Sequence, residues 1–233
     1  MTNARKWITD FTHLFFPHYC AGCGSDLVEE HQHICQQCYT SLPETNFSPY
    51  NNNPIEKIFY GRVDVTEAMA AYYFTKHSVL QQLIHTLKYR NNKEVGLQLG
   101  RWMGVLLKNS NRFISIDALV PLPLFPEKEK KRGYNQATVL CEGISEIINV
   151  PVANEFIQRK RYTDTQTKKG RSERWKNVDG SFEINDAMLK RYKHVLLVDD
   201  VITTGATLEA CGSAVKDSGT ALSVAVLAWA SDD

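Results

Sequence analysis

Two adjacent acids open the part of the sequence that offers the most chemistry. Asp199 and Asp200 follow the apolar run VLLV, and the turn TTGAT at 203–207 comes shortly after them. The run contains no polar residue, so we expect a strand buried on both faces with the two carboxylates at its end. Apolar residues at 208, 211 and 215 then predict a helix that begins near 205–207.

A helix start of this kind can hold a phosphate group. The first amides of a helix have no partner within the helix, and the helix dipole is positive there, so an anion binds without any lysine. Hydroxyl groups and a glycine that permits close backbone approach add to this. Two carboxylates beside the turn can accept hydrogen bonds from vicinal sugar hydroxyls, so the combination suits a ribose 5-phosphate. The residues predicted to bind this group are Asp199, Asp200, Thr203, Thr204, Gly205, Ala206 and Thr207.

The same stretch also has a simpler interpretation. A threonine would cap the helix, and the acids would lie near the positive end of its dipole. Other phosphate motifs are missing, since the sequence contains neither Gly-x4-Gly-Lys-Ser/Thr nor Gly-x-Gly-x2-Gly. A receiver-domain acid pair follows a first strand, whereas only 33 residues come after Asp200.

Four cysteines near the start of the chain have the spacing of a metal site. Cys20, Cys23, Cys35 and Cys38 form two Cys-x2-Cys pairs separated by eleven residues. Each pair can direct two thiolates at one point, and four thiolates complete a tetrahedral zinc site without an open position for water. We therefore predict structural zinc, with a redox or disulfide role as the alternative. Three nearby histidines could replace a thiolate: His18, His31 and His33.

Composition narrows the class of protein. The 233 residues, 43% of them hydrophobic, can bury one sizeable core with a small appended module. With 27 basic and 26 acidic residues the net charge is +1, which gives no global attraction to nucleic acid or membrane. No window reaches the roughly 18 apolar residues that cross a bilayer, and the first 20 residues lack a signal-peptide pattern. Clustered cysteines suggest a reducing compartment, so we expect a soluble cytoplasmic protein.

Strands and helices alternate along the rest of the chain. Apolar runs predict strands at 68–74, 116–123, 195–199 and 222–229. Helical spacing of apolar residues predicts helices at 79–90, 95–108 and 135–148. This alternation is typical of an α/β domain with a doubly wound, mainly parallel sheet.

Ligands of such sheets bind beyond the carboxyl ends of the strands. We therefore look to the loops at 123–134, 158–177 and 199–207 for the site. The polar stretch at 48–54 is typical of a linker or turn. It predicts two domains, an N-terminal helix with the four-cysteine zinc module at 1–47 and the α/β domain at 48–233.

The motifs, taken in order, carry a resemblance to a known family. VLLVDDVITTGATL resembles the phosphoribosyl pyrophosphate (PRPP) signature of type I phosphoribosyltransferases. The paired Cys-x2-Cys, LKYR at 87–90, PLPLFPEKEKKRGYNQA at 121–137, and Gln166 with RWKN at 174–177 complete the pattern. Over nearly its whole length the chain resembles the competence protein F (ComF) family.

The resemblance implies a magnesium-dependent phosphoribosyltransferase whose acceptor, an amine or a base, is not identified. Asp199 and Asp200 would hold the ribose hydroxyls of PRPP, and 203–207 would hold its 5-phosphate. Magnesium would bridge the pyrophosphate and the ribose hydroxyls. In relatives that transfer to 6-oxopurines, an acid stands at the position of Thr203, so the threonine argues against purine salvage.

The resemblance also implies where the leaving pyrophosphate is bound. The loop with Arg132 and Gly133 matches the pyrophosphate-side loop, and the basic segment 158–177 matches the family's mobile loop. Arg132 and Arg174 are the predicted catalytic residues, with Arg159 as a further candidate. Together they would stabilise the charge of the departing group.

A second function stays open beside the enzyme. Membership of a competence family implies a non-catalytic PRPP- or nucleotide-sensing module in DNA uptake, or natural transformation, together with DNA-uptake proteins. Basic segments 128–132 and 158–176, with Tyr134, Tyr162 and Trp175 interleaved, would then contact single-stranded DNA. A scaffold with a vestigial site is the third alternative.

Overall fold

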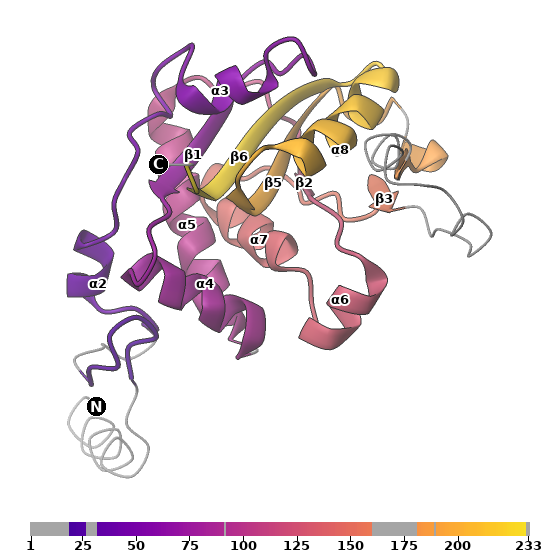
Figure 1. Cartoon of the computed structure of the whole chain (residues 1–233). Helices are drawn as coiled ribbons and strands as arrows, with labels where there is room; N and C mark the ends of the chain where they lie inside the picture. Colours follow the sequence, from indigo (N-terminus) through magenta and orange to yellow (C-terminus); the bar gives the residue numbers. More distant parts are fainter. Residues whose placement is uncertain (1–18, 27–31, 91, 160–180, 189, 232–233) are drawn as a thin grey trace, which may run out of the picture.

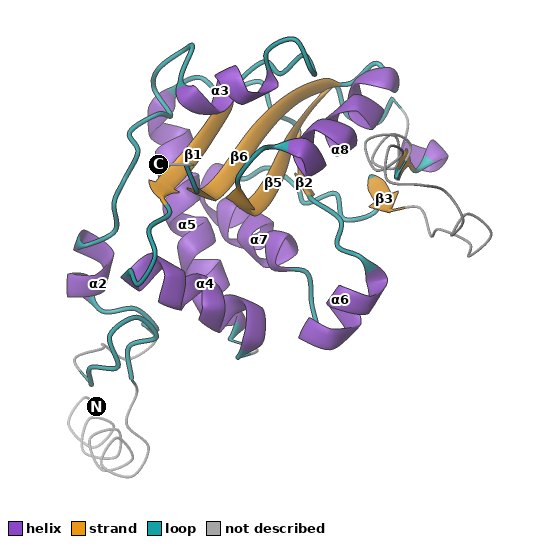
Figure 2. Cartoon of the chain, in the orientation of Figure 1, coloured by secondary structure: helices purple, strands orange, loops and turns teal. Residues whose placement is uncertain are grey.

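A parallel sheet forms the centre of the molecule. The computed structural model describes residues 19–26, 32–90, 92–159, 181–188 and 190–231. Within them, the central sheet has four strands in the order β1-β6-β5-β2, and every neighbouring pair is parallel (Figures 1 and 2). The strands are β1 (Ala68–Tyr73), β2 (Ala118–Pro121), β5 (His194–Ile202) and β6 (Ala221–Trp229). The predicted α/β fold with a parallel sheet is confirmed.

Helices cover both faces of this sheet. Val195 and Leu197 of β5 pack with α3 (Pro54–Phe59) and α8 (Ala206–Asp217). Leu196 and Val198 pack against the opposite layer, which consists of α4 (Val79–Tyr89), α5 (Lys93–Ser110) and α7 (Gln136–Ile148). Since consecutive strand residues point to opposite faces, β5 is apolar throughout this run because both of its faces are covered. Figure 1 shows α3 and α8 in front of the sheet.

The closest helix contact joins α5 and α7. Gly100 and Gly143 face each other there, and a Cβ on Gly143 would overlap the carbonyl group of Leu97. Glycine is required because the two backbones approach too closely for any side chain. This contact fixes α7, whose first turn borders the carboxyl end of β2.

Shorter elements complete the described part of the chain. They are α2 (Gln36–Thr40), α6 (Pro126–Arg132), the antiparallel pair β3 (Ile157–Arg159) and β4 (Phe182–Ile184), and a 3-10 helix at Asp186–Met188. The sequence predicts only a loop at 123–134, but α6 forms within it, because Pro126 starts the helix and Gly133 ends it at a φ of 82°. Across the described residues, no helix is both long and apolar enough to span a membrane.

Candidate functional site

The turn after β5 leads into a helix where the sequence predicts one. β5 ends at Ile202, and α8 begins at Ala206 with Gly205 as its N-cap at a φ of 76°. No side chain caps the helix, so the simpler interpretation of a threonine cap is wrong. Residues 203–207 line a cavity of about 70 Å³ together with Asp199. Thr203, Thr204 and Thr207 are exposed there.

Gly205 is enclosed by α3, which the sequence did not connect with this site. A Cβ at Gly205 would lie 2.6 Å from Cγ2 of Ile58 and 3.6 Å from the ring of Phe59. Both the positive φ and this contact require glycine. The loop after α3 adds Arg62, whose guanidinium donates a hydrogen bond to the Thr204 carbonyl at 3.0 Å. Residues 58–62 therefore support the turn at 203–207, here called the phosphate turn after its predicted ligand, from the outside.

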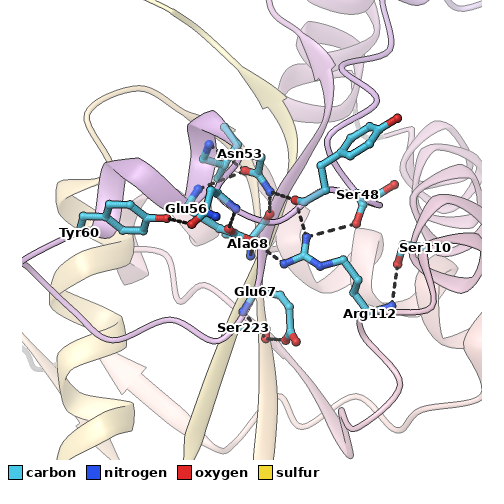
Figure 3. A network of polar contacts seen from close by, with 12 residues as sticks. Ser48, Asn53, Glu56, Tyr60, Glu67, Ala68, Ser110, Arg112 and Ser223 are labelled. Carbon is cyan, nitrogen blue, oxygen red and sulfur yellow. Dashed lines mark hydrogen bonds and ion pairs between the residues drawn. The ribbon is translucent and has the colours of Figure 1, made fainter.

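A buried ion pair holds α3 in place (Figure 3). Arg112 donates to Oε1 of Glu56 at 2.6 Å, and their side chains are only 13% and 9% exposed. Arg112 also donates to the Tyr50 carbonyl at 2.8 Å, while the Asn53 side chain accepts from the Ile55 amide at the helix start. The stretch 48–54 is thus a structured support for α3, and its polar side chains are used for capping and for this network.

The acid pair lies inside β5 rather than at its end. β6 pairs with β5 as far as Ile202, so β5 continues beyond the acids. The neighbouring strand β2 stops earlier, where Pro121 pairs with Val198. The prediction of a strand ending at Asp199 was wrong in this respect, because β6 extends the pairing where β2 does not. The acids therefore border an open edge of the sheet next to the end of β2.

Each acid meets a different environment. Asp200 is buried and forms an ion pair with Lys88 of α4, with 2.7 Å between Oδ2 and Nζ. Asp199 accepts a hydrogen bond from the amide of Asp200 at 2.8 Å. Burial of the carboxyl and the neighbouring charge of Asp200 raise the pKa of Asp199 to about 8. The sequence missed Lys88, although it lies in the LKYR motif that supported the family resemblance.

A second cavity adjoins the turn at 203–207 and is lined by two of the predicted pyrophosphate residues, Arg132 and Arg159. It measures about 250 Å³ and shares Asp199 and Thr207 with the smaller cavity. Four basic side chains line it together with the two acids: Lys88, Lys128, Arg132 and Arg159. Such an excess of cations around a polar cavity suits a polyanionic ligand.

Arg132 and Arg159 are held against aromatic rings. Arg132 donates to Oε1 of Gln136 at 2.5 Å, and its guanidinium lies 5.7 Å from the ring centroid of Tyr89. Arg159 stacks on Phe125 at 3.6 Å and lies 4.8 Å from Phe182. The structure thus brings Arg132 and Arg159 to the cavity.

Some residues predicted for this site lie outside the described part of the chain, and one has a different role. Arg174, Tyr162 and Trp175 lie outside the described residues, as does most of the segment 158–177. Tyr134 is 7% exposed, and its hydroxyl donates to the Leu87 carbonyl. The idea that Tyr134 stacks on DNA bases was therefore wrong, because this ring is a packing anchor that ties the loop after α6 to α4.

The four cysteines meet at one point. All of their sulfur atoms lie within 4.8 Å of one another. Cys20 and Cys38 are separated by 3.7 Å between sulfurs, and so are Cys23 and Cys35. Zinc–sulfur bonds of about 2.3 Å in a tetrahedron require about 3.8 Å between sulfurs, so the arrangement fits zinc. A disulfide would need about 2.05 Å, and all four cysteines are free.

Backbone amides favour the thiolate form of Cys20. Burial acts to raise the pKa of Cys20, but hydrogen bonds from backbone amides lower it to about 6. Two of these donors are the amides of Gly22 and Cys35, at 3.4 and 3.3 Å. His33 lies outside the four-sulfur cluster, and His18 and His31 are not among the described residues.

The cysteine cluster packs on the helical layer of the α/β fold. Tyr39 and Trp102 of α5 stack with 4.4 Å between ring centroids. A Cβ on Gly22 would lie 3.0 Å from Cγ1 of Val79, at the start of α4. Cys20, Cys35 and Cys38 belong to the same hydrophobic cluster as the core of that layer. The domain boundary at 47/48 stays a prediction.

Comparison with known proteins shows which families and proteins this chain is similar to. The family described as "Phosphoribosyl transferase domain" matches residues 134–231, which include the acid pair and the phosphate turn. Competence protein F of Haemophilus influenzae is 29% identical over 210 residues, covering 88% of this chain and 80% of that protein.

Two further relatives match over shorter spans. DNA utilization protein YhgH of Escherichia coli is 29% identical over 153 residues, covering 64% of this chain and 65% of that protein. Competence protein ComFC of Bacillus subtilis is 32% identical over 106 residues, covering 46% of this chain and 41% of that protein. Less than two thirds of these two relatives is therefore matched. The chain is thus similar to competence protein F over most of its length, and with its parallel sheet it has a type I phosphoribosyltransferase-like domain.

Proposed function

We propose that this protein binds PRPP with magnesium and acts as a phosphoribosyltransferase. The observation that carries the proposal is the pair of adjoining cavities that share Asp199 and Thr207. One has the turn at 203–207 and fits a 5-phosphate, and the other has an excess of basic side chains and fits a pyrophosphate. The two acids would accept hydrogen bonds from the vicinal hydroxyls of a ribose bound between these groups.

The residues of the site would have different roles in the transfer reaction. The bond between the anomeric carbon and the pyrophosphate oxygen breaks, its electron pair leaves with the pyrophosphate, and the acceptor nitrogen forms the new bond. Arg132 and Arg159 would stabilise the charge that grows on the leaving group. Arg174 is proposed for the same role. Magnesium, when bound with PRPP, would supply further positive charge to stabilise the leaving group.

The acceptor side is proposed only by class. A nucleophilic amine or base would attack the anomeric carbon opposite the pyrophosphate. Threonine at position 203, where 6-oxopurine enzymes carry an acid, speaks against purine salvage. We further propose that Cys20, Cys23, Cys35 and Cys38 hold a structural zinc ion, since four thiolates leave no open position for catalysis.

A non-catalytic role in DNA uptake is the second candidate. The E. coli relative is named a DNA utilization protein. The basic residues Lys128, Lys130 and Lys131 of α6 are exposed beside the larger cavity, where they could pair with phosphates of single-stranded DNA. This module would use PRPP as a signal and would bind DNA or DNA-uptake proteins without transferring the sugar.

Thermal unfolding with magnesium and PRPP tests the common part of both candidates. A ligand that binds only the folded state raises the midpoint temperature of unfolding. At a ligand concentration one hundred times Kd, the free energy of unfolding rises by about 2.7 kcal/mol. We expect this rise in the wild type and its loss in the Asp199→Ala, Asp200→Ala double variant, with the exposed Asp186→Ala as control. An equal rise in the double variant would refute the assigned site.

A pyrophosphate-release screen separates the enzyme from the binding module. Bases, amines and single-stranded DNA are offered as acceptors with PRPP and magnesium. Release that depends on one acceptor class supports the transferase. PRPP binding without release from any acceptor, combined with salt-sensitive DNA binding, supports the module.

A further inference from the structure

The ion pair between Lys88 and Asp200 is the feature of the site that its proposed function does not yet use. Lys88 lies in the last turn of α4, and its Nζ is 2.7 Å from Oδ2 of Asp200. The two side chains are 20% and 12% exposed, so the pair is largely shielded from water. Both residues line the larger cavity, which places the pair at the ligand rather than behind it.

The structure holds Lys88 firmly in this position. Leu80, Leu83 and Leu87 of α4 are fully buried, which fixes the rotation of the helix about its axis. The Tyr134 hydroxyl donates to the carbonyl of Leu87, directly before Lys88. A lysine side chain loses much rotational freedom on ordering, and this anchoring reduces the freedom that remains to be lost.

Asp200 lies where an ion pair can orient its carboxylate. It is buried, and the carboxyl of Asp199 is its immediate neighbour. Two adjacent carboxylates repel each other, and a lysine at ion-pair distance offsets this repulsion. The other cations of the cavity are Lys128, Arg132 and Arg159, and each lies near an aromatic ring: Lys128 and Arg159 at Phe125, and Arg132 at Tyr89. Lys88 forms the ion pair with Asp200.

We propose that Lys88 is a positioning residue that determines the specificity of this site for a vicinal ribose diol. It holds the Asp200 carboxylate in one orientation, so that the acid can accept a hydrogen bond from a sugar hydroxyl. A carboxylate has about four lone-pair sites, so one N–H of Lys88 leaves acceptor capacity for the ligand. The proposal rests on the proposed function, because it concerns the same sugar-phosphate site.

Specificity between two sugar phosphates measures this role directly. Ribose 5-phosphate has both vicinal hydroxyls, 2-deoxyribose 5-phosphate lacks one of them, and inorganic phosphate tests the turn at 203–207 alone. Titration calorimetry gives the three dissociation constants without magnesium. For the wild type we expect ribose 5-phosphate to bind at least about tenfold more tightly than the deoxy sugar, as a hydrogen bond to a charged group provides.

The variants separate specificity from general electrostatics. For Lys88→Met we expect the ratio of the two sugar constants to fall below about threefold, with the phosphate constant changed by less than about twofold. Lys88→Arg keeps a cation and is expected to retain a ratio within about threefold of the wild type. The matched control is Lys128→Met, which removes a cation from the same cavity and is expected to leave the ratio unchanged.

A double-mutant cycle guards against a purely structural effect. Asp200→Asn is expected to lower the ratio as Lys88→Met does, and combining both changes is expected to lower it no further, because they break one interaction. A Lys88→Met variant that folds and keeps the wild-type ratio would overturn the inference alone. A folded wild type that binds neither phosphate nor ribose 5-phosphate would instead overturn the proposed function, and the inference with it.

Discussion

Replacing Asp199 by asparagine should make the protein more stable at neutral pH while removing its ligand contact. The pKa of Asp199 is raised from 3.8 to about 8 by burial of the carboxyl and by the charge of Asp200. The folded state therefore keeps a proton that the unfolded chain releases. Asparagine has nearly the same shape, and its oxygen can still accept the hydrogen bond from the Asp200 amide.

The sign and size of the effect follow from proton linkage. Below about pH 4 the carboxyl is protonated in both states and costs nothing. Between about pH 4 and pH 8 the free energy of unfolding falls by about 1.4 kcal/mol for each pH unit, since only the unfolded chain is ionised. Above about pH 8 both states are ionised and the loss is complete. At pH 7, the difference between the pH and the usual pKa of the carboxyl lowers the free energy of unfolding by on the order of 4 kcal/mol.

Urea unfolding of wild type and Asp199→Asn at half-unit steps from pH 5 to 9 measures this difference. We expect the stability advantage of Asp199→Asn to grow with pH and to level off near pH 8. The exposed Asp186→Asn serves as control and should follow the wild type. If the advantage of Asp199→Asn is the same at pH 5 and pH 8, the carboxyl does not keep its proton in the folded state and the reasoning fails.

Three further changes test the supports of the site. Glu56→Gln should lower the free energy of unfolding by about 3–5 kcal/mol, because it leaves a buried guanidinium without its charged partner. Lys216→Met, which breaks an exposed ion pair, should lower it by less than about 1 kcal/mol. Urea unfolding compares the two variants. Cys23→Ala should abolish stoichiometric zinc in metal analysis, while Cys23→His should retain it, since imidazole also binds zinc; zinc in purified Cys23→Ala would contradict the four-thiolate site. Gly143→Ala should destabilise the fold by about 1–3 kcal/mol through overpacking between α5 and α7, and a melting temperature equal to wild type would show that the helices can separate freely.

The sequence was sufficient for features whose signal is local. The apolar run before Asp199 and the helical spacing after Gly205 predicted β5, α8 and the turn between them. The cysteine spacing predicted a four-sulfur cluster that the structure contains. These patterns are read from neighbouring residues, because strand burial, helix faces and metal-ligand pairs all have short repeats.

Features that depend on contacts between distant segments could not be predicted in this way. The stretch 48–54 is as polar as a linker, yet Asn53 is buried as the cap of α3 and the network there secures a wall of the phosphate turn. Lys88 lies on a helix whose apolar face was predicted correctly. Its partner is 112 positions away in the chain, and nothing in the local pattern distinguishes it from a solvated lysine.

The positions of Asp199 and Asp200 in β5 show how a local motif and contacts between distant segments together form the site. Asp199 and Asp200 are consecutive, so their side chains leave the sheet on opposite faces. Asp199 lies with the phosphate turn and α8, while Asp200 lies with Lys88 and α4. A ligand that engages both acids must therefore bind at the edge where β2 has ended and the two faces become accessible together. The early end of β2 at Pro121 is thus as important for the site as the acids themselves, because a longer β2 would separate the two carboxylates.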